Sequence, residues 1–408
     1  MIKTLRQSAF FLFSSSLFII SCSKTNQKGE SSSTMHTSLI HHKYGLTQVT
    51  PEELKNVPIF SEELFRSNII ANGLTFSGKK PTSYLLATPA VRDQGQIGAC
   101  TGFSGTEANE IVHYYSYTTV PAPPTLTVAN ALATAVNTKF LTPTNYFGVD
   151  GSLAPLFLYY VERVLIQKQK ITVDNGANMI NIGEALQGLS NNTGTGKALT
   201  SGSNTFAGES TEDLYPYPIT LDGDGYNEAT SSSTQYKTAP SAAAIANAPK
   251  FNLAAQSGTT GSTGTTAHGY YLITSSGDTT EVNNVKTAIL NNKPVLFGFN
   301  VYDNASYTIF EGLNTTSYIY NPLVAKTKNG TTTYVLNTKL TLEGGHAVPL
   351  IGYVDDGTAS TSATGGGYFV VQNSWGTPWG YNGDFLLPYS VLRNTTVCAN
   401  GNLYVLIP

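Results

Sequence analysis

The stretch DQGQIGACTGFS, residues 93–104, places Cys100 directly behind a glycine-rich turn. After Cys100, apolar side chains recur at helical intervals, which predicts a long helix that begins at the cysteine. The free N–H groups and the dipole at a helix N-terminus favour negative charge, and therefore the reactive thiolate form of a cysteine placed there. A lone cysteine is more often a buried structural residue, so a nucleophilic role needs further support from the sequence.

Gln94 and His346 supply part of that support. The side-chain amide of Gln94 can point to where an attacked carbonyl oxygen gains charge, and the Cys100 backbone N–H can be the second donor of this oxyanion hole. His346 follows two glycines in the segment GGHAV, residues 344–348, and we expect it to open a strand. An imidazole there can take the thiol proton and return it to a leaving amine.

The segment QNSWGTPWG, residues 372–380, supplies the rest. Asn373 ends a predicted strand, and its amide oxygen can hold one imidazole nitrogen of His346 and present the other to Cys100. The indole of Trp375 can keep water away from that hydrogen bond. Because Cys100 begins a helix beside His346, we expect a thiolate and imidazolium pair, with the pKa of the cysteine lowered and that of the histidine raised.

In order, spacing and flanking residues, these segments resemble the papain-like cysteine peptidases, and the NSWGxxWG pattern is highly specific. The resemblance covers about residues 84–408. It implies an α+β fold of two lobes, a helical lobe at about residues 93–245 and an antiparallel β-barrel-like lobe at about residues 250–408, with the active cleft between them. It also implies hydrolysis of peptide bonds in peptide or protein substrates, without a cofactor or a metal.

The resemblance assigns a role to each matching position. Segments 153–160 and 215–217 resemble further landmarks of the family, and residues 174–177 correspond to its glycine-rich substrate wall. The implied catalytic residues are Cys100, His346, Asn373 and Gln94, and the implied substrate-binding residues are Gly176, Ala177, Gly345, Trp375 and Trp379.

Three departures from the family signature stand out. Ile97 replaces a second cysteine and Thr101 replaces an aromatic residue, and neither change touches the proton chemistry. The separation of Cys100 from His346 also exceeds the about 130 to 150 residues of the signature. Low-complexity stretches, which we expect to be loops, account for much of this excess at little energetic cost. They span residues 191–205, 256–266 and 357–367.

Hydrophobic periodicity predicts the remaining elements. We expect one or two short helices within residues 51–70 and further helices at about 154–169 and 181–189. Strands are expected at residues 295–301, 346–354, 368–372, 384–387 and 403–407, in an antiparallel sheet or barrel. Pro349 cannot donate a ladder hydrogen bond, so its strand should lie at an edge or be bulged there.

The N-terminus has the order of a secretory signal, with Lys3 and Arg6 before an apolar run at residues 9–20. Cys22 follows directly and resembles the acceptor of bacterial lipoproteins, with Ile19 where the usual pattern has leucine. We therefore expect a signal peptide at residues 1–21 and a lipid anchor on Cys22, which would hold the protein at the outer membrane or surface of a bacterial envelope. An ordinary signal peptide cut nearby is the alternative. Residues 22–83 would form a tether and N-terminal segment, with or without the role of an inhibitory prosegment.

Composition argues against several other functions. Lys and Arg total 23 against 26 Asp and Glu, and no basic stripe stands out that could neutralise the phosphates of a nucleic acid. The acidic segment 222–228 lacks the full spacing of a calcium loop, and neither His41 nor His42 has the companions that a metal site needs. Of the 3 cysteines, Cys398 has no evident disulfide partner.

Two alternatives to peptide hydrolysis stay open. The first is a catalytically silent protein that binds peptides on the same scaffold, although all four catalytic residue types are retained. The second is acyl transfer or amide ligation at the same site, which the sequence cannot separate from hydrolysis.

Overall fold

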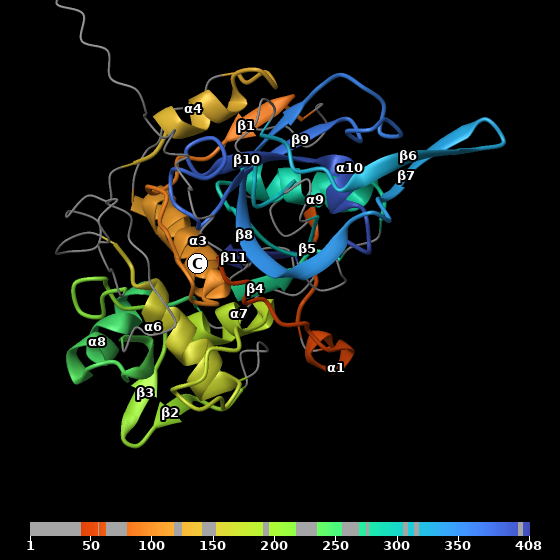
Figure 1. The fold of residues 1–408 in the computed structure, drawn as a ribbon. Helices are drawn as coiled ribbons and strands as arrows, with labels where there is room; N and C mark the ends of the chain where they lie inside the picture. The colour runs from red at the N-terminus through yellow and green to blue at the C-terminus, as the bar shows by residue number, and fades with distance from the viewer. Residues whose placement is uncertain are drawn as a thin grey trace, which may run out of the picture. The chain divides into compact units, whose positions relative to one another are not determined.

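The computed structural model of the 408-residue chain separates into residues Met1–Leu39 and Ile40–Pro408. It describes residues 42–55, 57–62, 80–117, 125–140, 152–190, 196–217, 235–254, 269–274, 277–304, 309–313, 318–398 and 403–408 (Figure 1). The predicted signal peptide, Cys22, His41 and the segments 63–70, 222–228 and 256–266 lie outside the described residues. No described helix combines the length and the apolar character that crossing a membrane requires.

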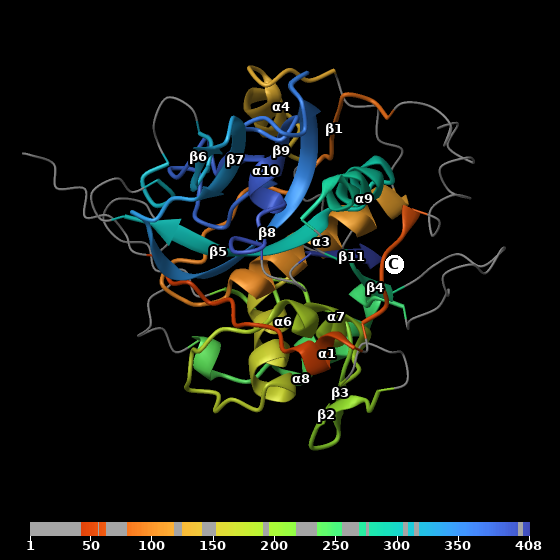
Figure 2. The same cartoon turned by 90° about the vertical axis from the view of Figure 1, so that its right-hand side faces the viewer.

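The long helix α3, Cys100–Tyr117, begins at the cysteine as predicted. Every residue from Cys100 to His113 is buried, because the helix lies between the sheet and the other helices (Figure 2). Two glycines allow the next helix to approach closely. A Cβ on Gly102 would lie 2.6 Å from the carbonyl oxygen of Pro155, and one on Gly105 would lie 2.6 Å from Leu158 Cδ2.

The other helices of this half gather on one side of α3 (Figure 1). Helix α6, Pro155–Tyr160, continues as the π-helix η2, Val161–Ile166, in agreement with the helix expected at 154–169. Helix α7, Met179–Gln187, follows, and the Asn178 side chain caps its N-terminus. The short elements η3, Gln235–Lys237, α8, Ala242–Asn247, and η4, Ala248–Phe251, complete the group.

The expectation that residues 191–205 form only a loop is wrong. Strand β2, Leu199–Ser201, pairs with β3, Asn204–Phe206, in a two-stranded hairpin. Leu199 and Phe206 lie opposite each other and are both buried, so these two apolar residues tie an otherwise polar stretch to the core. Of the loop expected at residues 357–367, residues 357–366 contain no strand, whereas Gly367 already begins the strand Gly367–Gln372.

A seven-stranded sheet forms the other half, in the order β10-β9-β8-β5-β11-β4 with β1 paired to β8. All of its pairings are antiparallel, and the described strands do not close into a barrel. All five strands predicted from the sequence are present. The sheet contains β1 Ser83–Leu85, β4 Gly269–Leu272, β5 Val295–Asp303, β8 Thr341–Asp355, β9 Gly367–Gln372, β10 Asp384–Pro388 and β11 Leu403–Ile407.

Strand β8 differs from the prediction at its start. It begins at Thr341, so His346 lies inside the strand rather than opening it. The early part of β8 pairs with the far end of β5, which is itself two residues longer than predicted, and this pairing was not visible in the local sequence. At Pro349 the ladder contains only Leu296 of β5, and the pairing with β9 shifts register between Leu350 and Gly352. The irregularity expected from Pro349 is therefore present.

Alternation along β5 separates two hydrophobic cores. Val295 and Phe297 pack in one core, whereas Leu296 packs in the other, because successive side chains point to opposite faces of a sheet. The first core includes α9, Thr279–Leu290, which packs against β5 and β8, and α4, Ala131–Asn137, which packs against β10. The second core joins the sheet to α6 and α7.

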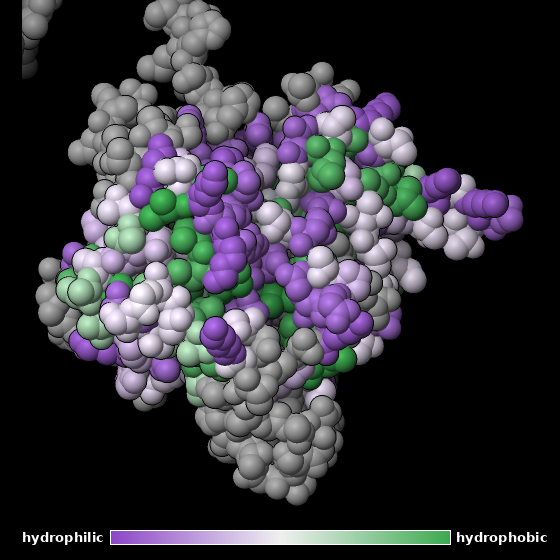
Figure 3. All heavy atoms as spheres, turned by 90° about the horizontal axis from the view of Figure 1, so that it is seen from below, coloured by the Kyte–Doolittle hydropathy of each residue, from purple (hydrophilic) through white to green (hydrophobic). Residues whose placement is uncertain are grey.

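Two small elements lie on the outside. Helix α1, Pro51–Leu54, is a single turn, and the hairpin of β6, Leu323–Lys328, and β7, Thr331–Leu336, projects from the sheet half (Figure 1). Helix α10, Tyr389–Leu392, is also a single turn, but all four of its residues are buried. Viewed from below, the described surface mixes hydrophilic and hydrophobic residues (Figure 3). The exposed large hydrophobic residues in the described ranges are Ile59, Tyr117, Val324 and Leu342.

Candidate active site

Cys100 lies at the N-terminus of α3 with 0% of its surface exposed. The backbone N–H of Ala347, which follows His346 in β8, is directed at its thiol. The N-terminus of α3 and the middle of β8 therefore bring the predicted nucleophile and the predicted base to the same place, although they are far apart in the sequence.

His346 is held through one of its ring nitrogens. Its Nε2 lies 2.7 Å from Asn373 Oδ1, which also accepts a hydrogen bond of 2.8 Å from the backbone N–H of Ser374. Within the described part of the chain, His346 Nδ1 has no hydrogen-bond partner. Since Nε2 is engaged by Asn373, Nδ1 is the nitrogen that can exchange a proton with the thiol.

Aromatic rings enclose the hydrogen bond between His346 and Asn373. The ring centroid of His346 lies 5.1 Å from that of Trp375 and 5.9 Å from that of Phe310. The Phe310 ring also packs against Trp379, whose indole N–H donates to the Phe310 carbonyl at 3.0 Å. Trp379 thus supports the aromatic wall from behind. Water is kept from the imidazole and amide pair, as the sequence suggested for Trp375.

Gln94 is oriented by a residue that sequence reasoning missed. Its Oε1 accepts a hydrogen bond of 2.6 Å from Ser374 Oγ, so the amide nitrogen must point the other way. That nitrogen donates to the carbonyl oxygens of Ile97 and Lys43, both at 3.0 Å. Ser374 lies next to Asn373 in the quoted motif, and this position was the only signal that could have identified it.

Residues 42–47, here called the strap, run between the sheet and the helices (Figure 2). The Leu46 N–H donates to the Gly345 carbonyl at 3.0 Å, and the Thr47 N–H donates to the Ala177 carbonyl at 2.8 Å. The Ala177 N–H donates to the Gly45 carbonyl at 2.9 Å. The strap is therefore hydrogen-bonded to both halves of the fold at once.

Gly45 lies too close to neighbouring backbone atoms for a residue with a side chain to replace it. A Cβ on Gly45 would lie 1.8 Å from the carbonyl oxygen of Gly98, and a Cβ on Gly176 would lie 1.7 Å from the carbonyl oxygen of Gly45. Gly176 also has a φ of 77°, which strongly favours glycine. The backbone of the strap thus lies against the turn before Cys100 and against the loop that contains Gly176.

The side chains of the strap contact predicted site residues. His42 stacks on Trp375 with ring centroids 4.6 Å apart, and its Nε2 lies 3.1 Å from Asp93 Oδ1. The Tyr44 ring meets His346 edge-on at 6.1 Å. Leu46 packs beside Met179 in a space that Gly298 leaves open, since a Cβ on Gly298 would lie 2.9 Å from both side chains.

The ionisation of the site differs from the expected thiolate and imidazolium pair. Burial raises the pKa of Cys100 to about 12, and the N–H groups of Gly45 and Ala347 oppose this rise only in part. Burial lowers the pKa of His346 to about 4, although its bond to Asn373 acts in the opposite direction. Burial thus favours the neutral form of both groups, and the strap is one of the segments that keep water from them.

The structure brings most of the predicted residues together. Gly176, Ala177, Gly345 and Trp375 all contact the strap, whereas Trp379 lies behind Trp375 and Phe310. In the ranges that the structure describes, no group of three or more His, Cys, Asp and Glu side chains could hold a metal ion.

Asp303 is a second residue that the sequence did not reveal. Its carboxylate accepts hydrogen bonds from the backbone N–H groups of Ile309 at 2.6 Å, Phe310 at 3.1 Å and Glu311 at 2.9 Å. These bonds hold the short turn that presses Phe310 against His346. The Glu311 side chain accepts a hydrogen bond of 3.3 Å from Tyr44 Oη, so the same turn also contacts the strap.

A family model described as papain family cysteine protease matches residues 207–400 of the chain. The matched range contains His346 and Asn373, whereas Gln94 and Cys100 precede it. An uncharacterised peptidase C1-like protein of Acanthamoeba polyphaga mimivirus is 26% identical over 122 residues, which cover 29% of this chain and 30% of that protein. The match therefore spans less than a third of the length of this curated relative.

Among solved structures, xylellain, a cysteine protease from Xylella fastidiosa, is similar with a TM-score of 0.53 and 19% identity. The similarity covers 89% of this chain and 95% of that of xylellain. It confirms the two-lobed α+β fold expected from the sequence. The family model thus matches the part of the chain that contains two of the predicted site residues, and the similarity to xylellain shows the papain-like fold.

Proposed function

We propose that the protein is a cysteine-type peptidase that hydrolyses peptide bonds, with Cys100 as nucleophile and His346 as base. The observation that carries this proposal is the position of the Lys43 carbonyl. Its oxygen accepts a hydrogen bond from Gln94 Nε2, while the N–H of Gly45, two residues on, is directed at the Cys100 thiol. A peptide backbone thus already occupies the place between the oxyanion donor and the nucleophile where a substrate carbonyl would be attacked.

The proposed reaction has two steps, in which Cys100 is first acylated by the substrate and then released by water. The thiolate of Cys100 attacks the carbonyl carbon, and Gln94 with the Cys100 backbone N–H stabilises the oxyanion. His346 returns its proton to the leaving amine, and water then releases the acyl group from the sulfur. Asn373 orients His346 throughout by holding Nε2.

The strap would make this peptidase latent, so that residues 22–83 include an inhibitory prosegment. In support, the strap blocks the Gln94 donor and is one of the segments that bury the thiol and favour the neutral form of both titrating groups. An active form then requires the strap to leave the cleft, either by a conformational change or by cleavage of the chain.

The function can be tested by labelling and product analysis. An epoxide or iodoacetamide should modify Cys100 once the strap is released, and the labelled protein should no longer act on a peptide library. Mass spectrometry of the products distinguishes hydrolysis from ligation, because ligated peptides are heavier than either substrate. Labelling of Cys100 without any loss of substrate peptides would instead favour the catalytically silent binding protein.

The proposed location at the bacterial cell envelope rests on Cys22. Metabolic labelling with a palmitate analogue is expected to tag the wild-type protein and not Cys22→Ser, because the thiol is the proposed acceptor. The tagged protein should fractionate with membranes. An untagged wild-type protein found only in the culture medium would replace anchoring by simple secretion.

A further inference from the structure

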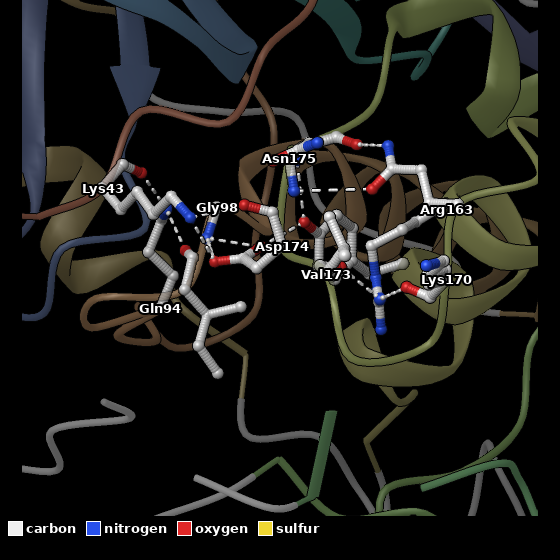
Figure 4. Close-up of polar contacts among 12 residues, drawn as sticks. Lys43, Gln94, Gly98, Arg163, Lys170, Val173, Asp174 and Asn175 are labelled. Atoms are coloured by element: carbon white, nitrogen blue, oxygen red, sulfur yellow. Dashed lines mark hydrogen bonds and ion pairs between the residues drawn. The ribbon is translucent and has the colours of Figure 1, made fainter. Parts of the chain in front are cut away.

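Lys43 of the strap makes two contacts with the site, one through its backbone carbonyl and one through its side chain (Figure 4). Its backbone carbonyl accepts the hydrogen bond from Gln94 Nε2, and its side-chain Nζ lies 2.7 Å from Asp174 Oδ2. The same Nζ donates to the backbone carbonyl of Asp174. The residue whose carbonyl lies at the oxyanion donor therefore places a cationic side chain on Asp174.

Asp174 is fixed in place before any ligand arrives. The N–H of Gly98 donates to both of its carboxylate oxygens, at 3.2 Å and 3.1 Å. Tyr159 Oη donates to Oδ1, and burial raises the pKa of this phenol well above its ordinary value, so it keeps the proton that it donates. The Asp174 side chain is only 5% exposed. It cannot turn away from the cleft without breaking these bonds.

The loop that contains Asp174 is also held by hydrogen bonds on the side away from Lys43 (Figure 4). The buried guanidinium of Arg163 donates to the carbonyls of Ile171 at 2.9 Å and Val173 at 2.5 Å, and to that of Tyr236 at 2.6 Å. On the other side of Asp174, Gln169 Nε2 donates to the Gly176 carbonyl at 2.8 Å. A carboxylate held this firmly is preorganised for a cation.

Release of the strap would remove the cation and leave this carboxylate facing the cleft without its partner. A nearly buried carboxylate that loses its ion pair is unfavourable, and a new basic side chain would restore the interaction. A neutral side chain of the same length would leave the carboxylate unpaired, and sites built around polar groups discriminate strongly against such analogues.

We propose that Asp174 is a specificity-determining residue, which binds the lysine or arginine side chain of the substrate residue whose carbonyl is attacked. The inference rests on the proposed peptidase function, and it names the substrate class as peptides cleaved after a basic residue. In the strap, one lysine residue reaches from the Gln94 amide, through its carbonyl, to Asp174, through its side chain. The strap then inhibits by occupying with Lys43 the position that a substrate side chain would take.

The test uses the full chain with the strap released by Gly45→Ala and a set of peptides that differ only before the scissile bond. Peptides with Lys or Arg there are expected to have a kcat/KM about tenfold or more above the peptide with Met, and the peptide with Glu should be slowest. Asp174→Asn keeps an acceptor for the Gly98 N–H but removes the charge. It should abolish the preference for Lys and Arg over Met, mainly through KM.

A second readout does not depend on catalysis. In the Cys100→Ala form with the strap released, calorimetry should show tighter binding of the Lys peptide than of the Met peptide, and Asp174→Asn should remove the difference. Asp93→Asn is the matched control, because it removes a different carboxylate that contacts the strap, through His42, and should retain the preference.

The outcomes separate the inference from the proposed function. Equal rates and equal affinities for the Lys and Met peptides, or a preference that survives Asp174→Asn, would overturn the role of Asp174. Selective binding of the Lys peptide without hydrolysis in the released wild-type active site would support Asp174 while contradicting the peptidase assignment.

Discussion

Gly45→Ala is expected to raise the rate of peptide hydrolysis about 10- to 100-fold, the gain available if the covered cleft is open about 1 to 10% of the time. The physical reason is steric. A Cβ at residue 45 would lie 1.8 Å from the Gly98 carbonyl oxygen, so the strap could no longer lie against the turn before Cys100. Initial rates with a fluorogenic peptide, measured for the wild-type protein and the variant at equal concentration, give the factor directly.

The pH dependence of cysteine alkylation provides a second measurement of the same change. In the wild-type protein, burial raises the pKa of Cys100 to about 12, so modification by iodoacetamide should be slow near neutrality and rise only toward alkaline pH. In Gly45→Ala, water reaches the site, and the helix N-terminus and His346 can then stabilise the thiolate. Modification of the variant should therefore extend to mildly acid pH.

A matched variant controls for changes near the strap. Gln48 is exposed and lies just beyond it, so Gln48→Ala should keep the wild-type rate and alkylation profile. If Gly45→Ala also kept the wild-type rate of hydrolysis and the wild-type alkylation profile, the strap would not be what limits access to Cys100. Lys43→Met, combined with Gly45→Ala, should further weaken the binding of the strap to the site, because it removes the ion pair with Asp174.

Cys100→Ala, introduced into the Gly45→Ala form, is expected to lower peptide hydrolysis by about 10³-fold or more, because no other group can form the acyl intermediate. The fold should persist, since the substitution removes one buried sulfur and leaves the backbone of α3 intact. Turnover is measured with the same fluorogenic peptide, and circular dichroism and the unfolding temperature report on the fold.

Substitutions of the other site residues should lower activity by different amounts. His346→Ala should be nearly as severe as Cys100→Ala, because proton transfer to the leaving amine is lost. Asn373→Ala should retain more activity, since Asn373 orients the imidazole and carries no proton itself. Substantial turnover by Cys100→Ala would be incompatible with the proposed mechanism, and an order in which Asn373→Ala is the most damaging would contradict the role given to His346.

Local sequence was sufficient for the elements that contain the site. Apolar residues at helical spacing predicted α3 from Cys100 onward, and runs of β-branched and aromatic residues predicted β5, β9, β10 and β11. The sequence motifs also predicted that Asn373 holds His346, whereas Ser374, which bonds to both Gln94 and Asn373, was not foreseen. These features depend on neighbours close in the chain or on a short motif.

Two local interpretations failed for the same physical reason. The hairpin of β2 and β3 lies in a stretch of Gly, Ser and Thr, and only the burial of Leu199 and Phe206 against distant helices makes it form. Strand β8 begins at Thr341 because β5 offers it a pairing partner there. In both cases a tertiary contact outweighed a weak local preference.

The sequence by itself therefore determined the helix that begins at Cys100, the antiparallel strands and the residues expected to do chemistry. Only the tertiary structure decided the state of the site. The contacts of the strap with Gln94, Asp174 and Gly345 join residues that are distant in the chain, and no periodicity or motif records them. The pKa of a thiol depends on whether water reaches it, and the strap that helps to exclude this water is positioned by packing and hydrogen bonds between distant segments.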